Sequence, residues 1–281
     1  MTTTPIATIT GLTFRYSEES PPIFNQLDYN LYPGMRYILC GRNGCGKSTL
    51  LELLAGRRLA PSNTISVDGI DPFRNTRVNN IVGLLNNQWG MRTVAYCGYN
   101  LPLQSSISVD EMMISRKRNF PEREKVLREV LMINLEWRLN NISEGQRKRV
   151  QLYLNLLQPY KLLLLDEITV NLDVVIKSRF MDFLYQESTR GCTIVYVTHI
   201  FDGLGDWCNR IIHMEQGRLE ETAIEKIPQK DVYHYILKRI TSSASPTSKK
   251  PEPPETPQEY RDNIGSTNNA GGYTNGTLTS L

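Results

Sequence analysis

Residues 35–57 read MRYILCGRNGCGKSTLLELLAGR, and this stretch decides the fold. The apolar run MRYILC predicts a buried β-strand, and KSTLLELLAGR has the apolar spacing of a helix. Between them, residues 41–49 match the pattern G-x-x-x-x-G-K-[ST]. A glycine-rich loop between a strand and a helix turns its N–H groups toward one anion, and the helix N-terminus adds positive charge. The stretch therefore predicts a phosphate-binding loop in an α/β protein.

The residue types in this loop suit ATP with Mg²⁺. Lys47 places a cation on the β- and γ-phosphates, and Ser48 offers a hydroxyl to Mg²⁺. Cys45 is expected to be the most reactive thiol and to be covered by bound ATP, because the N–H groups and Lys47 favour a thiolate. The alternative is a Cys45 side chain that points into the core and is inert. The other loop residues expected to bind nucleotide are Gly41, Asn43, Gly44, Gly46 and Thr49.

Two further apolar runs, KLLLLDE at 161–167 and CTIVYVTH at 192–199, predict buried strands. Residues 173–188 between them have helical spacing. Strand, helix and strand in this order imply parallel strands with a helical crossover. Ligands bind at the carboxyl ends of such strands. Asp166 is therefore expected to hold the Mg²⁺ shell and Glu167 to act as general base on the attacking water.

Other parts of the chain are patterned differently. Residues 7–16 alternate like an antiparallel edge strand, residues 64–71 contain an Asp-Gly turn, and residues 209–221 resemble a hairpin. Residues 108–158 are mostly helical in pattern. The predicted fold class is α/β, with a phosphate-loop core, an antiparallel β subdomain at the front and a helical subdomain.

The domain organisation follows from these patterns. Residues 1–240 are expected to form one domain, with the helical subdomain at about 100–158. Residues 241–281 are rich in Ser, Thr, Pro, Asn and Gly and have few large apolar residues, which predicts a disordered tail. The Asn-rich stretch 74–92 is weakly patterned and is interpreted as a surface insertion loop.

Residues 142–152, ISEGQRKRVQL, precede the strand that ends at Asp166. Taken alone, this segment predicts an ordinary helix capped by Ser143. Taken with the two motifs above, it resembles the signature of the ABC (ATP-binding cassette) ATPases, which is L-S-G-G-Q followed by a basic helix. Ser143, Gly145 and Gln146 match the signature, whereas Ile142 and Glu144 depart from it.

The resemblance implies an ABC-type ATPase that works as a head-to-tail homodimer. In the family, the signature caps the γ-phosphate of ATP bound to the opposite subunit, so its three matching residues are expected to act in trans. Asp173 in VNLD matches the loop that crosses the dimer interface. His199 matches the histidine that contacts the γ-phosphate and joins Lys47 and Glu167 as a catalytic residue. Tyr16 matches the aromatic residue that stacks on adenine, although plain packing is the alternative.

Several stretches, such as DGIDPF at 68–73, resemble a eukaryotic branch of ABC ATPases that lack membrane domains. The branch includes a fungal factor of the NOT deadenylase complex and plant non-intrinsic ABC proteins. Transporter-linked members carry a glutamine where this chain has Tyr99 or Asn100. The alternative is that the nearby Gln104 takes the place of that glutamine from a shifted loop. The resemblance implies a regulatory ATPase of a gene-expression complex. The alternatives are the ATPase subunit of a transporter with a separate membrane chain, and a module that holds ATP without turnover.

Composition limits the other function classes. The 32 basic and 29 acidic residues give a net charge of +3, which argues against a nucleic-acid coat protein. The cysteines form no CxxC pair and no metal cluster with the three histidines, as expected of reduced thiols in the cytoplasm or, alternatively, the nucleus. No signal peptide and no bilayer-spanning run is recognised. The expected partners are ATP, a second copy of the chain and NOT/deadenylase subunits, without membrane insertion.

Overall fold

The predicted strand, loop and helix form as β3 (Arg36–Gly41), a turn and α1 (Lys47–Leu54). The computed structural model describes residues 4–86, 108–117, 119–170, 172–201, 203–228 and 231–242. For residues 114–117 and 242 it describes the backbone alone. The other elements are β1 (Ala7–Phe14), β2 (Phe24–Leu31), β4 (Ile65–Val67), η1 (Thr76–Asn80), β5 (Val82–Leu85), α2 (Val109–Lys117), α3 (Pro121–Val130), η2 (Leu139–Asn141), α4 (Glu144–Leu156), β6 (Leu162–Asp166), α5 (Val174–Thr189), β7 (Thr193–Val197), α6 (Leu204–Trp207), β8 (Arg210–Glu215), β9 (Arg218–Ala223), η3 (Ile224–Lys226) and α7 (Val232–Ser242).

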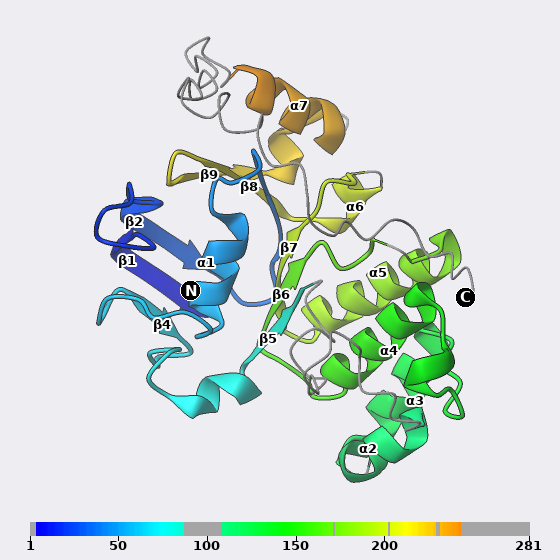
Figure 1. Cartoon of the computed structure of the whole chain (residues 1–281). Helices are drawn as coiled ribbons and strands as arrows, with labels where there is room; N and C mark the ends of the chain where they lie inside the picture. Colours follow the sequence, from blue (N-terminus) through cyan, green and yellow to red (C-terminus); the bar gives the residue numbers. More distant parts are fainter. Residues whose placement is uncertain are drawn as a thin grey trace, which may run out of the picture. The chain divides into compact units, whose positions relative to one another are not determined.

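A six-stranded sheet in the order β5-β6-β7-β3-β8-β9 forms the centre of the fold (Figure 1). Its first five strands are parallel, and β9 returns antiparallel to β8. Every residue of β3 and β7 is buried, which explains why both strands read as continuous apolar runs. The parallel strands bring the carboxyl ends of β3, β6 and β7 to one edge.

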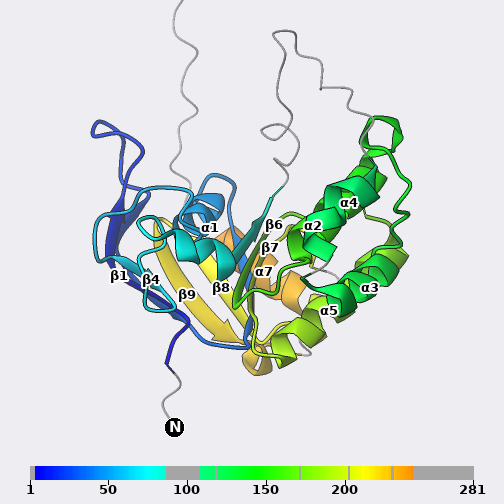
Figure 2. The same cartoon turned by 90° about the horizontal axis from the view of Figure 1, so that it is seen from below.

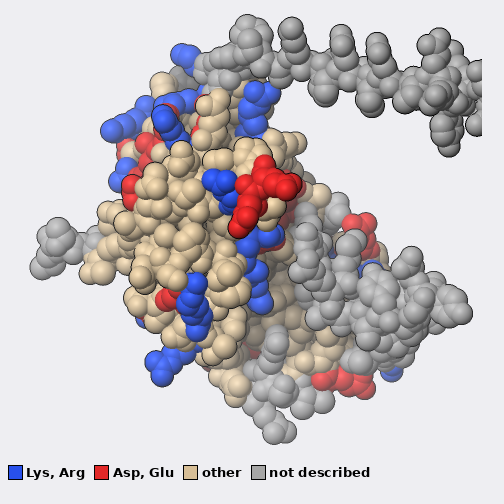
Figure 3. Space-filling view, turned by 60° about the vertical axis from the view of Figure 1, so that its left-hand side comes forward, with Lys and Arg blue, Asp and Glu red and all other residues tan. Residues whose placement is uncertain are grey.

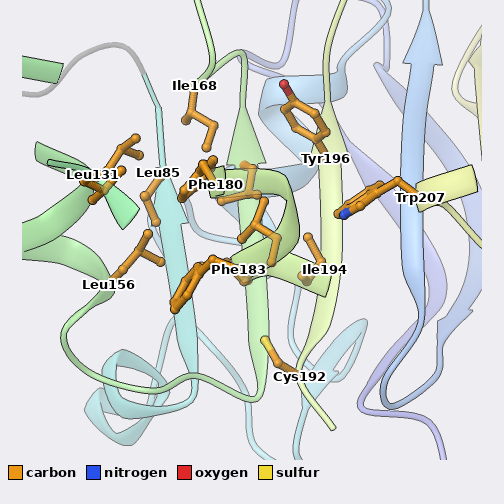
Figure 4. Packing of buried hydrophobic residues seen from close by; sticks show 14 of the residues in the cluster. Leu85, Leu131, Leu156, Ile168, Phe180, Phe183, Cys192, Ile194, Tyr196 and Trp207 are labelled. Carbon is orange, nitrogen blue, oxygen red and sulfur yellow. The ribbon is translucent and has the colours of Figure 1, made fainter. Parts of the chain in front are cut away.

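Two apolar clusters cover the two faces of this sheet. Helices α3, α4 and α5 contribute to one cluster, and α1 with the small sheet β2-β1-β4 contributes to the other. Figure 2 shows the same division from below. Figure 4 shows part of the helical cluster, in which Leu156 of α4 and Phe183 of α5 share the core with Ile194 of β7. The sheet therefore separates α1, with its phosphate loop, from α4.

The small sheet corrects one prediction about the front of the chain. β1 is its central strand, with β2 and β4 as antiparallel neighbours, and is not an edge strand. Its alternating pattern arises because one face of the sheet is buried, and this happens in central and edge strands alike. The two predicted turns do form, at Asp68–Gly69 and Gln216–Gly217, and all four residues have positive φ.

The stretch 74–92 also differs from its prediction as a surface loop. Among its described residues, β5 lies in the main sheet and pairs in parallel with β6. Gly83 packs so tightly that an added Cβ would lie 2.8 Å from the Tyr160 ring. The apolar run Val82–Leu85 has four residues, which is too short for periodicity to distinguish a strand from a loop.

Helices α2, α3 and α4 lie within the region where the sequence favours helix. The limits of the helical subdomain and the start of the tail stay predictions, and α7 extends past the expected boundary at residue 240. In the described part of the chain, no helix has the length and apolar character needed to cross a membrane. On the face that carries the small sheet, basic and acidic side chains are interspersed (Figure 3).

Candidate nucleotide site

The loop from Gly41 to Gly46 connects the end of β3 with the start of α1. Gly46 is the N-cap of α1 and has no side chain to occupy the first-turn N–H groups, which face the position of an anion at a helix N-terminus. An added Cβ on Gly46 would lie 2.7 Å from Ile23, and one on Gly41 would collide with the Met214 carbonyl. Gly44 has open space around it and φ of 79°, so the backbone requires this glycine.

Lys47 folds back over this loop. Its Nζ donates to the carbonyl oxygens of Gly41 at 2.8 Å and Arg42 at 3.0 Å, and the residue is only 8% exposed. An ammonium group has three protons, so one remains for a phosphate oxygen after these two bonds. The loop thus holds its cation in place before a nucleotide binds.

Ser48 and Asp166 form the second part of the site. Asp166 ends β6 and pairs in register with Val197 of β7, which in turn pairs with Leu39 of β3. The Ser48 hydroxyl donates to the Asp166 carboxylate. Burial raises the pKa of Asp166, and the bond from Ser48 and the charge of Lys47 oppose that rise. A hydroxyl beside a carboxylate is an oxygen pair that fits Mg²⁺, which takes most of its other ligands from phosphate and water.

Glu167 and His199 meet at the same edge. Glu167 Oε1 lies 2.9 Å from His199 Nε2, and both side chains are accessible. Glu167 has φ of 52°, a left-handed conformation that is costly for a residue with a side chain and that recurs at active sites. Its N–H donates to the Val197 carbonyl, which anchors this conformation to β7. The carboxylate is therefore held beside an imidazole and open to water.

Sequence reasoning missed two supporting groups. Thr169 and Tyr196 bring their hydroxyl oxygens to 2.6 Å of each other, two residues past Glu167 and three before His199. This bond joins the turn after β6 to β7. Tyr196 reads as one more apolar residue of a buried strand, so no signal in the sequence marks its hydroxyl.

Tyr16 lies beside the phosphate-loop helix. Its hydroxyl is 2.6 Å from the Thr49 hydroxyl, and 57% of the residue is exposed. The Arg58 guanidinium lies over the ring at 4.8 Å and is held by two hydrogen bonds to Glu52 of α1. Sequence reasoning missed Arg58 because only the turn after α1 brings it to Tyr16. The role of Tyr16 in binding adenine stays a prediction.

The signature residues lie at the start of α4. Ser143 is the N-cap, its Oγ accepts from Gln146 N–H, and Gln146 Oε1 accepts from Ser143 N–H. The segment therefore forms the ordinary helix capped by Ser143 that it predicts when taken alone, whether or not it also acts as a signature. Because α4 and α1 pack on opposite faces of the sheet, the chain does not bring its own signature to its own phosphate loop.

Asp173 caps α5 by accepting from the Ile176 N–H at 2.9 Å. The next two residues are exposed valines, and Val174 is 83% exposed. An apolar pair at the tip of a capped helix is suited to contact with another chain. The positions Tyr99, Asn100 and Gln104 lie outside the described residues.

The structure corrects the expectation of an activated Cys45. Burial raises the pKa of this thiol, although Lys47 and nearby N–H groups act in the opposite direction. The sulfur lies 2.9 Å from where a Cβ on Gly41 would stand, so it points behind the loop and packs against the core cluster that includes Met214. The inert alternative therefore describes Cys45 better, because lost hydration of the thiolate outweighs the favourable charges.

We accordingly expect slow alkylation of Cys45 near neutral pH, with little change on addition of Mg-ATP. The thiolate is the reactive form, and a raised pKa reduces its population. Limited alkylation followed by peptide mass spectrometry measures the rate, and Cys40, which is buried with a pKa raised to about 12, is the slow reference. Fast labelling of Cys45 that Mg-ATP suppresses would contradict the packed orientation.

The fold and the site together define the class of this protein. A parallel sheet with a glycine-rich loop after β3, and with Asp166 and Glu167 after β6, is the arrangement of the phosphate-loop α/β proteins. The ABC transporter family profile matches residues 24–170. The chain belongs to the ABC family and carries its ATP-binding cassette.

Curated relatives and solved structures agree with this assignment. The chain is 39% identical to ABC transporter I family member 20 of Arabidopsis thaliana, over 75% of this chain and 67% of the relative. It is 36% identical to CCR4-associated factor 16 of Saccharomyces cerevisiae, over 75% and 76%. A solved ATP binding subunit of an ABC transporter superposes with a TM-score of 0.67 at 17% identity, over 84% of this chain and 99% of that one, and supports the fold.

Proposed function

We propose that this chain hydrolyses Mg-ATP as a head-to-tail dimer in which each site combines two copies. One observation carries the proposal. Ser48–Asp166 and Glu167–His199 form two accessible pairs at one edge of the sheet, while the signature of the same chain is on the sheet's other face. A second copy can supply the missing part.

Within one chain, Lys47 and the loop N–H groups bind the phosphates. Ser48 and Asp166 would hold Mg²⁺, which supplies charge neutralisation for the transferred phosphoryl group when bound. Glu167 accepts a proton from the attacking water, whose oxygen forms a bond to the γ-phosphorus as the bond to the β–γ bridging oxygen breaks. His199, hydrogen-bonded to Glu167, holds the carboxylate in position. The resemblance to the family implies that it would also contact the γ-phosphate.

The second copy completes the site with Ser143, Gly145 and Gln146. The first turn of α4 presents N–H groups and the positive end of a helix, which suit the γ-phosphate. Asp173 and the exposed valines after it lie at the interface. Two ATP molecules would then join two copies, and hydrolysis would release them.

The biological role that we propose is regulation of a gene-expression complex in the cytoplasm or nucleus. The name of the yeast relative, CCR4-associated factor 16, supports an association with the NOT/deadenylase complex. The plant relatives are named ABC transporter family members, which supports the alternative of a transporter subunit with a separate membrane chain.

The composite site predicts a concentration-dependent enzyme. Specific activity with Mg-ATP should rise with chain concentration until dimerisation is complete, and EDTA or Lys47→Ala should abolish it. Phosphate release measures the specific activity, and light scattering measures the fraction of chains in dimers. Constant specific activity of a monomer would refute the dimeric mechanism.

Purification from the native cell separates the two proposed biological roles. Deadenylase subunits recovered in stoichiometric amount would support the regulatory role, and a membrane protein recovered in stoichiometric amount would support the transporter role.

A further inference from the structure

One side chain at the start of α3 ties three helices together. Arg123 Nη2 lies 2.7 Å from Oε2 of Glu187 in α5. The Nε of the same guanidinium donates at 2.7 Å to the carbonyl of Leu156, the last residue of α4. The guanidinium also lies over the Phe183 ring at 5.3 Å. Arg123 thus joins α3, the end of α4 and α5.

The contact between Arg123 and Glu187 is largely buried, and the guanidinium fixes its geometry. The side chains of Arg123 and Glu187 are 14% and 5% exposed, and the other Glu187 oxygen accepts from Arg190 at 3.1 Å. Removing Arg123 would leave the buried Glu187 carboxylate with the exposed Arg190 as its remaining ion-pair partner among those described, which is unfavourable. A planar guanidinium donates in fixed directions, so it sets the angle between helices as well as their distance. Figure 4 shows Leu156 and Phe183 in the surrounding apolar cluster.

The contact lies at the end of α4 opposite to the signature, so a small change of helix angle there moves the signature by a larger distance. α4 has 13 residues and is therefore about 20 Å long, with Arg123 at one end and Ser143 at the other. A rotation of about 10° around the Leu156 end would move the Ser143 end by about 3 Å over this length. α5, the other anchor, packs on β7 and begins at Val174, seven residues after Glu167.

We propose that Arg123 is a positioning residue for ATP hydrolysis. It fixes the angle at which this chain presents its signature to the ATP that a second copy holds, and the inference rests on the composite site proposed above. Arg123 acts on the far side of the sheet from its own phosphate loop. Its loss should therefore spare ATP binding by a single chain and impair the trans function.

Two variants test the positioning role of Arg123, and both are chosen to limit the loss of stability. Arg123→Lys keeps the charge but has one nitrogen for two partners. The double variant Arg123→Met with Glu187→Leu removes both charges and fills the space, which limits the loss of stability. In both, kcat should fall by roughly 10- to 100-fold, as expected for a displaced catalytic group. Affinity of a single chain for ATP should change by less than about twofold, because the phosphate loop is intact.

The matched control is Arg128→Lys on the same helix. The Arg128 side chain is 41% exposed, and its Nε lies 3.7 Å from Oε1 of Glu124, a distance at which an i,i+4 ion pair contributes little. This variant should hydrolyse ATP at the wild-type rate. Equal losses in Arg128→Lys and Arg123→Lys would show a general sensitivity of α3 and would overturn the proposal.

Mixing experiments separate positioning in trans from a damaged fold. A limiting Arg123→Lys chain is mixed, before ATP is added, with a tenfold excess of Glu167→Gln chain. The mixed dimer contains one complete site, with Glu167 from one chain and a correctly placed signature from the other. Activity per Arg123→Lys chain should recover to about the wild-type value per chain, since each mixed dimer contains one such chain and one working site.

Gly145→Asp mixed with Glu167→Gln in the same way tests the composite site itself. Recovery in both mixtures supports the proposal. Recovery with Gly145→Asp but not with Arg123→Lys overturns the positioning role and leaves the proposed function intact. Recovery in neither mixture overturns the composite site and the positioning role with it, and full activity of the Arg123 variants alone overturns the positioning role.

Discussion

Glu167→Gln is expected to lower steady-state hydrolysis by roughly 10²- to 10⁴-fold, the range that a general base contributes. The amide keeps the shape of the side chain and its contact distance of 2.9 Å to His199, but it does not accept a proton from water. ATP that is bound but not cleaved should keep two copies joined. The variant should therefore be a dimer with Mg-ATP and a monomer without nucleotide.

Size-exclusion chromatography with light scattering measures this change in mass. Lys47→Ala is the matched control, because it removes the ammonium that the Gly41 and Arg42 carbonyls hold over the loop, and it should stay monomeric with Mg-ATP. A Glu167→Gln chain that remains monomeric at saturating Mg-ATP would contradict a site shared between two copies.

Gly145→Asp is expected to reduce turnover by more than about 100-fold, whereas Glu144→Gly should stay within about threefold of the original rate. Both residues lie in the first turn of α4. A carboxylate at Gly145 would stand where the γ-phosphate of the second copy must approach, and the two anions repel. Glu144 has an exposed side chain in the first turn of α4, so we expect its replacement by glycine to lower the helix propensity by about 1 kcal/mol and to change the rate little.

Thermal unfolding is the control for this pair of variants. An acidic residue in the first turn of a helix is favourable, so Gly145→Asp should keep the stability of the chain while losing activity. Steady-state assays at saturating Mg-ATP measure the rates. Similar losses in both variants would mean that the signature approaches the phosphate in a different register.

Several parts of the fold were predictable because their signals are local. The buried strands β3, β6 and β7 read as apolar runs because both faces of a parallel sheet are covered. The turns at Asp68–Gly69 and Gln216–Gly217 were predictable from residues that tolerate positive φ. By contrast, β5 is four residues long and is a strand only because β6 pairs with it.

The orientation of Cys45 also could not be predicted from the local sequence. Its neighbours along the chain favour a thiolate, and that led to the prediction of a reactive thiol. The thiol packs instead against an apolar cluster that includes Met214 of β8, more than 160 residues away in sequence. Packing against distant residues removes hydration from the sulfur, and no local pattern contains that information.

The sequence alone determined the class of this protein, its phosphate loop and the order of its motifs, because each depends on residues within about ten positions of one another. Only the tertiary structure decided that Ser48 meets Asp166, that Glu167 meets His199, and that Arg123 meets Glu187 and Leu156. Strand order and helix packing set these distances. They arise from the burial of apolar faces far apart in the chain, which a one-dimensional pattern does not contain.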